Sequence, residues 1–260
     1  GASLAGLCNR HIPFLAYKCR HSISKRIHGS HSVLEMYVVV YTIVFAILNI
    51  VDAVEWDCTA STNTGTFTRS SDCTISGTGN TNDQGGGVDV TGTLEIVGSS
   101  TDMENLVTIS AASKKRHFYV NGANDKLVLR YVKLVGGDVS SYGSWPDYNG
   151  GSISIRNAAE VKLYYCYLSN NTAHYGAAIY AEGTSSSTVK VYAENSILQE
   201  NSAGYSGGGM FIVYGTVTLT STTFASNSAA SGWGGGMYIY GDSSDVTLRQ
   251  CSFISNTASD

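Results

Sequence analysis

Apolar and polar residues alternate in short runs through the second half of the chain. Val217-Thr218-Leu219-Thr220 and Val246-Thr247-Leu248-Arg249 are two of these runs. A period of two residues is typical of a β-strand with one buried face. Gly, Ser and Asn separate the runs, and β-branched, aromatic and Gly residues dominate the region. Because helix-forming patterns are missing, the sequence predicts an all-β structure made of short strands.

One motif occurs four times between Val161 and Asp260. It consists of a bulky apolar residue, two variable residues and an asparagine. The asparagines follow one another at intervals of 30, 26 and 29 residues: Asn171, Asn201, Asn227 and Asn256. The first three motifs each precede a glycine-rich step into a strand: Gly176-Ala177-Ala178-Ile179, Gly207-Gly208-Gly209-Met210 and Gly234-Gly235-Gly236-Met237. A repeat of this length predicts stacked units that bury their apolar faces against one another.

The repeat length suits a parallel β-helix with three strands and three corners per turn over residues 54–260. Asparagines at one corner of successive coils would then form a hydrogen-bonded column; the alternative is that Asn and Gly only mark turns. Weaker copies precede Val161, because Leu127–Leu134 parallels the strand region before Asn171. The segment Gly136–Asn149 is longer than a corner needs and predicts an excursion loop. The repeat breaks off at Asp260, which indicates a helix truncated at its C-terminus.

The order and spacing of these motifs resemble the repeats of the chlamydial polymorphic outer-membrane proteins, which pair a Gly-Gly-Ala-Ile-type step with Phe-x-x-Asn. Phe224-Ala225-Ser226-Asn227 and Phe253-Ile254-Ser255-Asn256 match strictly, whereas Leu replaces Phe at Leu168 and Leu198. The resemblance covers residues 161–260. It implies a right-handed parallel β-helix on a cell surface, with adhesion as the usual role, and it brings no catalytic residues.

The N-terminal region differs from the repeats. Residues 1–35 hold five of the sixteen Lys and Arg and four of the six His, so they are interpreted as a basic unstructured leader or a gene-model artefact. Met36 opens a long apolar run of secretory h-region length. Residues 51–53, which follow it, offer small residues at positions −3 and −1 of a cleavage site after Ala53. Residues 36–53 are therefore predicted to be a signal peptide, with an uncleaved signal anchor as the alternative.

Composition also favours an extracellular protein. The chain has 29 Gly and 17 Tyr but only 14% charged residues. From Val54 onward there are 11 basic and 18 acidic residues, a net charge of −7, which gives no support to nucleic-acid binding. We expect a secreted or cell-surface protein. Membrane contact is expected only through the N-terminal hydrophobic segment or a C-terminal anchor beyond this sequence.

Four cysteines follow the signal segment. Cys58 and Cys73 flank a polar loop at the start of the predicted helix, where a disulfide would contribute about 3 kcal/mol. Cys166 and Cys251 each stand two residues before the bulky residue of a motif, at equivalent positions three coils apart. They are predicted to be buried free thiols too distant to bond. No Cys-x-x-Cys or paired His accompanies them, so no metal site is predicted.

Aromatic residues form the most suggestive array for binding. Four of them precede a Gly step by a few residues and are expected to line one edge of the stack: Tyr148, Tyr175, Tyr205 and Trp233. Three more follow the steps and are expected to form a second, outward row: Tyr180, Phe211 and Tyr238. An exposed aromatic strip binds sugar rings or a partner surface. The alternative is a self-stacking ladder that only strengthens the coil.

Other polar groups are weaker candidates. The basic cluster Lys114-Lys115-Arg116-His117 suits a sulfated or uronic sugar, or is only a solvated corner. Asn170 begins the sequon Asn170-Asn171-Thr172 and is expected to point outward, where it can be glycosylated. His174 is expected to be exposed in a corner loop.

Catalysis requires residues that the sequence does not group. Polysaccharide lyases of this fold need clustered carboxylates and a basic residue, and hydrolases need paired carboxylates, whereas Asp89, Asp125 and Asp138 are scattered singly. We therefore expect a non-enzymatic protein without a cofactor, which binds a glycan or protein partner in adhesion or recognition. The alternatives are a polysaccharide lyase or glycoside hydrolase of the pectin-lyase-like class, and a structural cell-wall or matrix protein.

Overall fold

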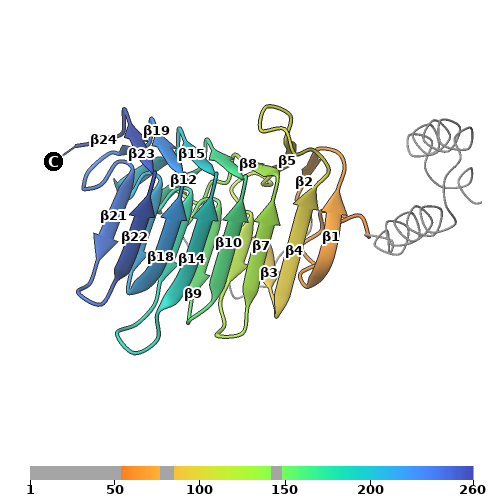
Figure 1. Cartoon of the computed structure of the whole chain (residues 1–260), viewed down its shortest axis with the longest axis horizontal. Helices are drawn as coiled ribbons and strands as arrows, with labels where there is room; N and C mark the ends of the chain where they lie inside the picture. Colours follow the sequence, from red (N-terminus) through yellow and green to blue (C-terminus); the bar gives the residue numbers. More distant parts are fainter. Residues whose placement is uncertain (1–53, 77–84, 142–147, 260) are drawn as a thin grey trace, which may run out of the picture. The chain divides into compact units, whose positions relative to one another are not determined.

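The computed structural model describes residues 54–76, 85–141 and 148–259. These residues form 24 strands and no helix, and every pairing between the named strands is parallel. Figure 1 shows the strands of successive coils lying side by side. The predicted all-β fold, a parallel β-helix, is confirmed.

Four parallel sheets form the faces of the β-helix. The first sheet contains β1 (Gly65–Arg69), β4 (Thr93–Gly98), β7 (Lys126–Arg130), β10 (Glu160–Tyr164), β14 (Val189–Glu194), β18 (Gly215–Thr220) and β22 (Asp245–Arg249). The second contains β2 (Cys73–Thr74), β5 (Val107–Ser110), β8 (Val132–Val135), β11 (Tyr167–Ser169), β15 (Ile197–Gln199), β19 (Thr223–Ala225) and β23 (Ser252–Ile254). The third contains β12 (Thr172–Tyr175), β16 (Ser202–Ser206), β20 (Ser228–Ala229) and β24 (Thr257–Ala258). The fourth contains β3 (Val88–Val90), β6 (Phe118–Val120), β9 (Ile153–Arg156), β13 (Ile179–Glu182), β17 (Met210–Val213) and β21 (Met237–Tyr240).

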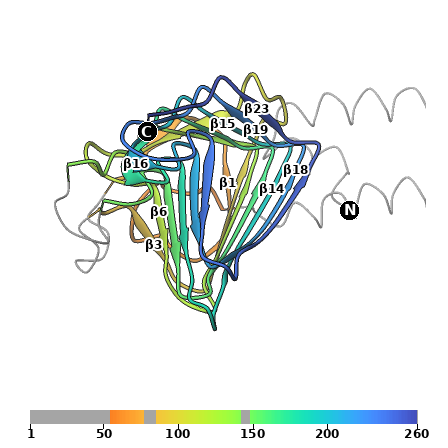
Figure 2. The same cartoon turned by 90° about the vertical axis from the view of Figure 1, so that its left-hand side faces the viewer.

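One coil is a passage of the chain through the sheets in order, for example from β10 through β11, β12 and β13 to β14, and Figure 2 views the coils from one end. The prediction of three strands per turn is wrong for the three coils that contain β12, β16 and β20, each of which has four strands. The additional third sheet consists of strands of two to five residues, in which Tyr175 and Tyr205 stand among small and polar residues. The segment Gly136–Asn149 meets this sheet at both ends, where Asp138 bridges Thr172 and Asn149 bridges Tyr175.

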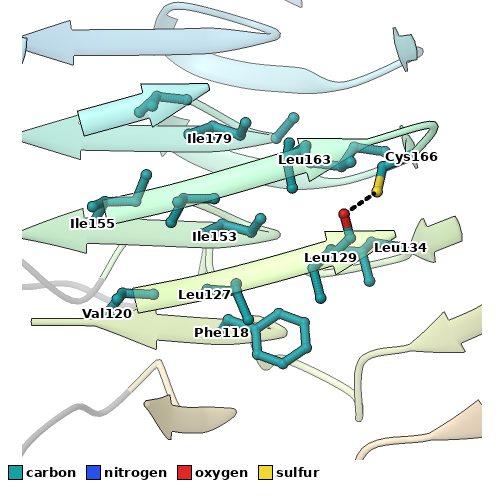
Figure 3. Close-up of a cluster of buried hydrophobic side chains, with 14 of the residues drawn as sticks. Phe118, Val120, Leu127, Leu129, Leu134, Ile153, Ile155, Leu163, Cys166 and Ile179 are labelled. Atoms are coloured by element: carbon teal, nitrogen blue, oxygen red, sulfur yellow. Dashed lines mark hydrogen bonds between the residues drawn. The ribbon is translucent and has the colours of Figure 1, made fainter. Parts of the chain in front are cut away.

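Strand register places equivalent residues of successive coils over one another. The bulky residues of the repeat motif and their earlier equivalents form one inward column of the second sheet: Ile109, Leu134, Leu168, Leu198, Phe224 and Phe253. Figure 3 shows part of the interior, with Phe118, Ile153 and Ile179 contributed by the fourth sheet and Leu129 and Leu163 by the first. Burial of these columns drives stacking, because no single coil encloses its own apolar residues.

The cysteines largely follow the prediction. Cys58 and Cys73 form a disulfide, with 6.4 Å between their Cα atoms. Cys166 is free and fully buried, and its Sγ donates to the Leu129 carbonyl oxygen over 3.3 Å (Figure 3). Cys251 is also free but only partly buried, so the prediction of a buried thiol is wrong there. It lies in the last described coil, on which no further described coil packs.

The leader predicted at residues 1–35 and the signal segment predicted at residues 36–53 lie outside the described residues. Within the described ranges, no helix has the length and apolar character needed to span a bilayer.

Candidate functional site: an aromatic groove across three coils

A column of asparagines fixes the corner beside the third sheet. The side-chain Nδ2 of Asn171 donates to Oδ1 of Asn201 over 2.8 Å, Asn201 donates likewise to Asn227 over 2.9 Å, and Asn227 to Asn256 over 2.9 Å. The same oxygens also accept backbone N–H groups, as in the 3.1 Å bond from Asn171 N to Asn201 Oδ1. The predicted column is confirmed, and it satisfies corner groups that would otherwise be buried without partners.

The residue before each of these asparagines has a left-handed backbone. Asn170, Glu200, Ser226 and Ser255 all have φ between 52° and 56°. None of them is glycine, so each corner carries a conformational cost of about 1 kcal/mol or more that the neighbouring asparagine bonds offset. Asn170 is exposed, as predicted, and its glycosylation stays a prediction.

The four aromatic residues predicted as one strip occupy two adjacent columns. Gly150, Gly176, Gly207 and Gly234 are equivalent positions, as their successive backbone hydrogen bonds show. Tyr175 and Trp233 stand one residue before this glycine, whereas Tyr148 and Tyr205 stand two residues before it. A β-bulge between β12 and β16 produces the offset, because an extra residue in β16 pairs Tyr175 with Ser206. The rings of Tyr175 and Tyr205 nevertheless stack at 5.3 Å between centroids, with 15° between their planes.

His174 completes the column of Tyr148 and Tyr205. Its ring lies 4.6 Å from that of Tyr148 and 5.5 Å from that of Tyr205. Nε2 of His174 is 3.0 Å from the Ser140 carbonyl oxygen, to which it donates. The prediction that His174 is simply exposed is wrong, since the excursion loop and the flanking rings half-bury it. The position two residues before a glycine step, shared with Tyr205, was the signal for this role.

The second aromatic row lies on the outer face of the fourth sheet. Tyr180, Phe211 and Tyr238 are paired in register, on the face opposite the interior residues Ile179 and Met210. Tyr180 and Phe211 stack at 5.6 Å with 14° between planes. The expectation that the whole row is exposed is wrong, because Tyr180 is fully buried and Phe211 nearly so. Burial also raises the pKa of the Tyr180 hydroxyl, with the nearby Glu182 carboxylate adding to the effect.

The two rows enclose a groove between the third-sheet corner and the outer face of the fourth sheet. Its volume is about 460 Å³. Its lining comes from three successive coils: Tyr175, Glu182, Tyr205, Ser206, Phe211, Val213, Ser231, Gly232, Trp233, Tyr238 and Tyr240. Trp233 is 61% exposed and Tyr205 46% exposed, so two rings of the predicted strip present free surface at this groove. Trp233 stacks on Tyr238 at 5.7 Å, and Tyr175 meets Phe211 edge-on at 5.1 Å.

One carboxylate lines the groove. Oε2 of Glu182 lies 2.6 Å from Nη1 of Arg156, which belongs to the preceding coil. The Arg156 side chain is 12% exposed and its guanidinium carbon lies 5.2 Å from the centre of the Tyr180 ring. Glu182 is 25% exposed. Arg156 therefore supports the carboxylate from the side of the sheet, while part of Glu182 faces the groove.

The basic cluster predicted as a binding site for acidic sugars, or as a solvated corner, differs in burial along its length: Lys114 is exposed and Lys115 is half-buried. Arg116 and His117 are buried. The excursion loop passes over them, since Asp138 N donates to the Lys115 carbonyl oxygen over 3.0 Å. Nε2 of His117 donates to the Ile109 carbonyl oxygen over 3.1 Å, and burial lowers the pKa of this imidazole to about 4.

The chemistry that this part of the chain can perform is recognition by ring faces and one fixed acceptor. In the ranges that the structure describes, no three His, Cys, Asp or Glu side chains gather in a way that would hold a metal ion. Comparison with known proteins finds no matching family model, no matching curated protein and no matching solved structure.

Proposed function

We propose that the β-helix binds a glycan through the aromatic groove, as an adhesion or recognition protein at a cell surface or in the extracellular space. The single observation that carries the proposal is the groove itself, in which Tyr205 and Trp233 expose their rings beside Tyr238. Aromatic faces stack on the C–H faces of sugar rings, and the Tyr hydroxyl and Trp N–H supply hydrogen bonds at their edges.

The size of the groove supports a small ligand segment. A volume of about 460 Å³ lies within the range of roughly 300 to 1,000 Å³ that is typical of sites for small molecules. A stable protein partner would need about 800 Å² of surface on each side, far more than a groove three coils long presents. One or a few sugar rings of a longer glycan fit this space better than a protein surface does.

Secretion and surface location belong to the proposal as well. The Cys58–Cys73 disulfide favours an oxidising compartment. The order and spacing of the repeat motifs resemble those of the chlamydial polymorphic outer-membrane proteins, and this resemblance favours an adhesive role. Hydrolysis of a glycan is a weaker candidate, because it normally requires two carboxylates on either side of the scissile bond, and Glu182 alone lines the described groove.

Glycan-array binding of the wild-type chain and of Tyr205→Ala and Trp233→Ala tests the proposal. We expect wild-type binding to a subset of glycans and a loss of about tenfold or more in affinity for each variant, because each removes an exposed ring face. Tyr165→Ala is the matched control, since Tyr165 stacks on Tyr131 at 5.0 Å on a different corner and should leave binding unchanged. Unaltered binding by both groove variants would contradict the proposal.

A further inference from the structure

The groove combines many aromatic rings with a single charged side chain. Its described lining contains five tyrosine or tryptophan rings besides Phe211, and it contains no Lys, Arg or His. Glu182 is the only ionisable acid among these lining residues. A ligand that carries carboxylate or sulfate groups would therefore lose hydration without finding a cation in the lining to pair with, which disfavours acidic sugars.

Glu182 is held in place more firmly than a surface glutamate. It ends β13 in register with Arg156 of β9, and the 2.6 Å contact between Oε2 and Nη1 fixes one side of the carboxylate. Arg156 is in turn held against the Tyr180 ring. A fixed acceptor loses little side-chain entropy when a ligand binds, so it contributes to affinity and orientation more effectively than a mobile one.

The lining of the groove changes from polar to apolar along the direction in which the coils stack. Strand register places Glu182, Val213 and Tyr240 in one outer column from three successive coils. Coils are spaced by about 4.8 Å, so the polar first position lies about 10 Å from the apolar third. Trp233 and Tyr238 belong to the apolar end. A glycan lying along this direction would thus place hydroxyl groups against the carboxylate at the Glu182 end. At the other end it would stack its ring faces on Trp233.

We propose that Glu182 is the specificity-determining residue of the groove, where its carboxylate, positioned by Arg156, accepts hydrogen bonds from the hydroxyl groups of an uncharged sugar and excludes uronic and sulfated sugars. This inference rests on the proposed function. Arg156 compensates the charge of Glu182, so the carboxylate acts as an acceptor of hydroxyl groups and not as the counterion of a cationic sugar.

Calorimetric titration of the full chain tests the inference with defined probes. The neutral probes are hexasaccharides of glucose, mannose and xylose; the others are hexagalacturonate, a heparin hexasaccharide and a glucosamine hexamer. We expect wild-type binding to at least one neutral probe and at least tenfold weaker binding to the acidic ones. Glu182→Gln should weaken binding of the neutral probe about tenfold and reduce its preference over hexagalacturonate by a similar factor.

Two variants guard against a folding defect. The double variant Arg156→Gln with Glu182→Gln removes both charges, so no buried cation is left alone, and it should show the same loss of preference. Glu194→Gln changes an exposed glutamate at the end of β14 and should bind as wild type does. Circular dichroism checks that each variant is folded.

The outcomes separate the two proposals. If no probe or array glycan binds the wild-type chain, or if both Tyr205→Ala and Trp233→Ala bind as wild type does, the proposed function fails. If Trp233→Ala loses binding while Glu182→Gln and the double variant keep the wild-type affinity and preference, only the role of Glu182 is overturned. Salt-sensitive preference of the wild type for the glucosamine hexamer would also overturn it, because Glu182 would then act as a counterion.

Discussion

Each buried asparagine of the corner column serves several backbone and side-chain groups at once. Oδ1 of Asn201 accepts from the backbone N and the Nδ2 of Asn171, and Nδ2 of Asn201 donates to the Leu168 carbonyl oxygen and to Asn227 Oδ1. Aspartate would repel its neighbours in the column, and serine is too short to span the gap between coils. The chemistry of the amide, which both donates and accepts, therefore accounts for the residue found at this corner.

Asn201→Ala tests this role. The substitution removes four hydrogen bonds and leaves the donors of Asn171 buried without partners, so we expect the free energy of unfolding to fall by about 3 kcal/mol. Gln199→Ala, at a half-exposed position two residues earlier whose amide bonds only to Glu200, should change it by less than about 0.5 kcal/mol. Denaturant unfolding measures both. Equal small changes would contradict the assigned role of the column.

His117 predicts a specific pH dependence of stability. Its folded pKa of about 4 lies below the ordinary value of 6.5, because burial disfavours the imidazolium. The unfolded state therefore takes up a proton first as the pH falls, and stability present above pH 6.5 is lost progressively towards pH 4. The loss amounts to about 3 kcal/mol at most.

The variant His117→Gln isolates this contribution, because Gln is neutral and its amide can still donate to the Ile109 carbonyl oxygen. We expect the midpoint of thermal unfolding to decrease less between pH 7.5 and pH 4.5 in the variant than in the wild type. Parallel pH profiles for the two proteins would show that His117 is not the titrating group.

Sequence patterns predicted individual residues where the same residue type recurs in phase. Asn171, Asn201 and Asn227 meet this condition, and so do the inward Leu and Phe of the motif. Arg116 and His117 do not, because a basic run normally indicates a solvated corner and only the path of the excursion loop buries it. His174 was missed for a related reason: it shares the position two residues before the glycine with Tyr148 and Tyr205, but its residue type differs from theirs.

At the scale of the elements, the third sheet is the main departure from the prediction. Its strands are short, and β20 has only two residues, so they leave little trace of alternation in the sequence. The bulge between β12 and β16 shifts the register by one residue. That shift pairs Tyr175 with Ser206 and leaves Tyr205 one residue farther from its glycine, although each Tyr stands four residues after the asparagine of its motif.

Substitution by alanine is expected to have opposite outcomes at two glycines near this sheet, destabilising the fold at one and being tolerated at the other. A Cβ atom on Gly208 would overlap the backbone carbonyl oxygens of Ser228 and Gly235, because neighbouring coils approach closely there. We expect Gly208→Ala to destabilise the fold by about 2 to 3 kcal/mol. Gly204 lies in β16 with its nearest neighbouring atom, the Cα of His174, 3.8 Å from a Cβ. Gly204→Ala should be tolerated, and denaturant unfolding compares the two. Equal tolerance would contradict the close approach at Gly208.

At the scale of the whole molecule, stacking produces both stability and the candidate site. Each coil contacts its neighbours in register, as in the pairing of β14 with β10 and β18, so the interior is continuous although no coil has a core of its own. The groove depends on the same stacking, because Glu182, Tyr205 and Trp233 come from three coils. The fold class was predictable because repetition is visible in the sequence, whereas the groove depends on distances across coils.

Tryptophan fluorescence of the full chain tests the central claim most directly. Trp233 is 61% exposed at the groove, and Trp56 is fully buried. Titration with the neutral hexasaccharides of glucose, mannose and xylose should give a saturable shift of emission to shorter wavelength, because a stacked sugar ring removes water from the indole. Trp233→Phe should abolish the shift. Absence of a saturable change with every neutral probe, or an equal change in Trp233→Phe, would contradict glycan recognition at this groove.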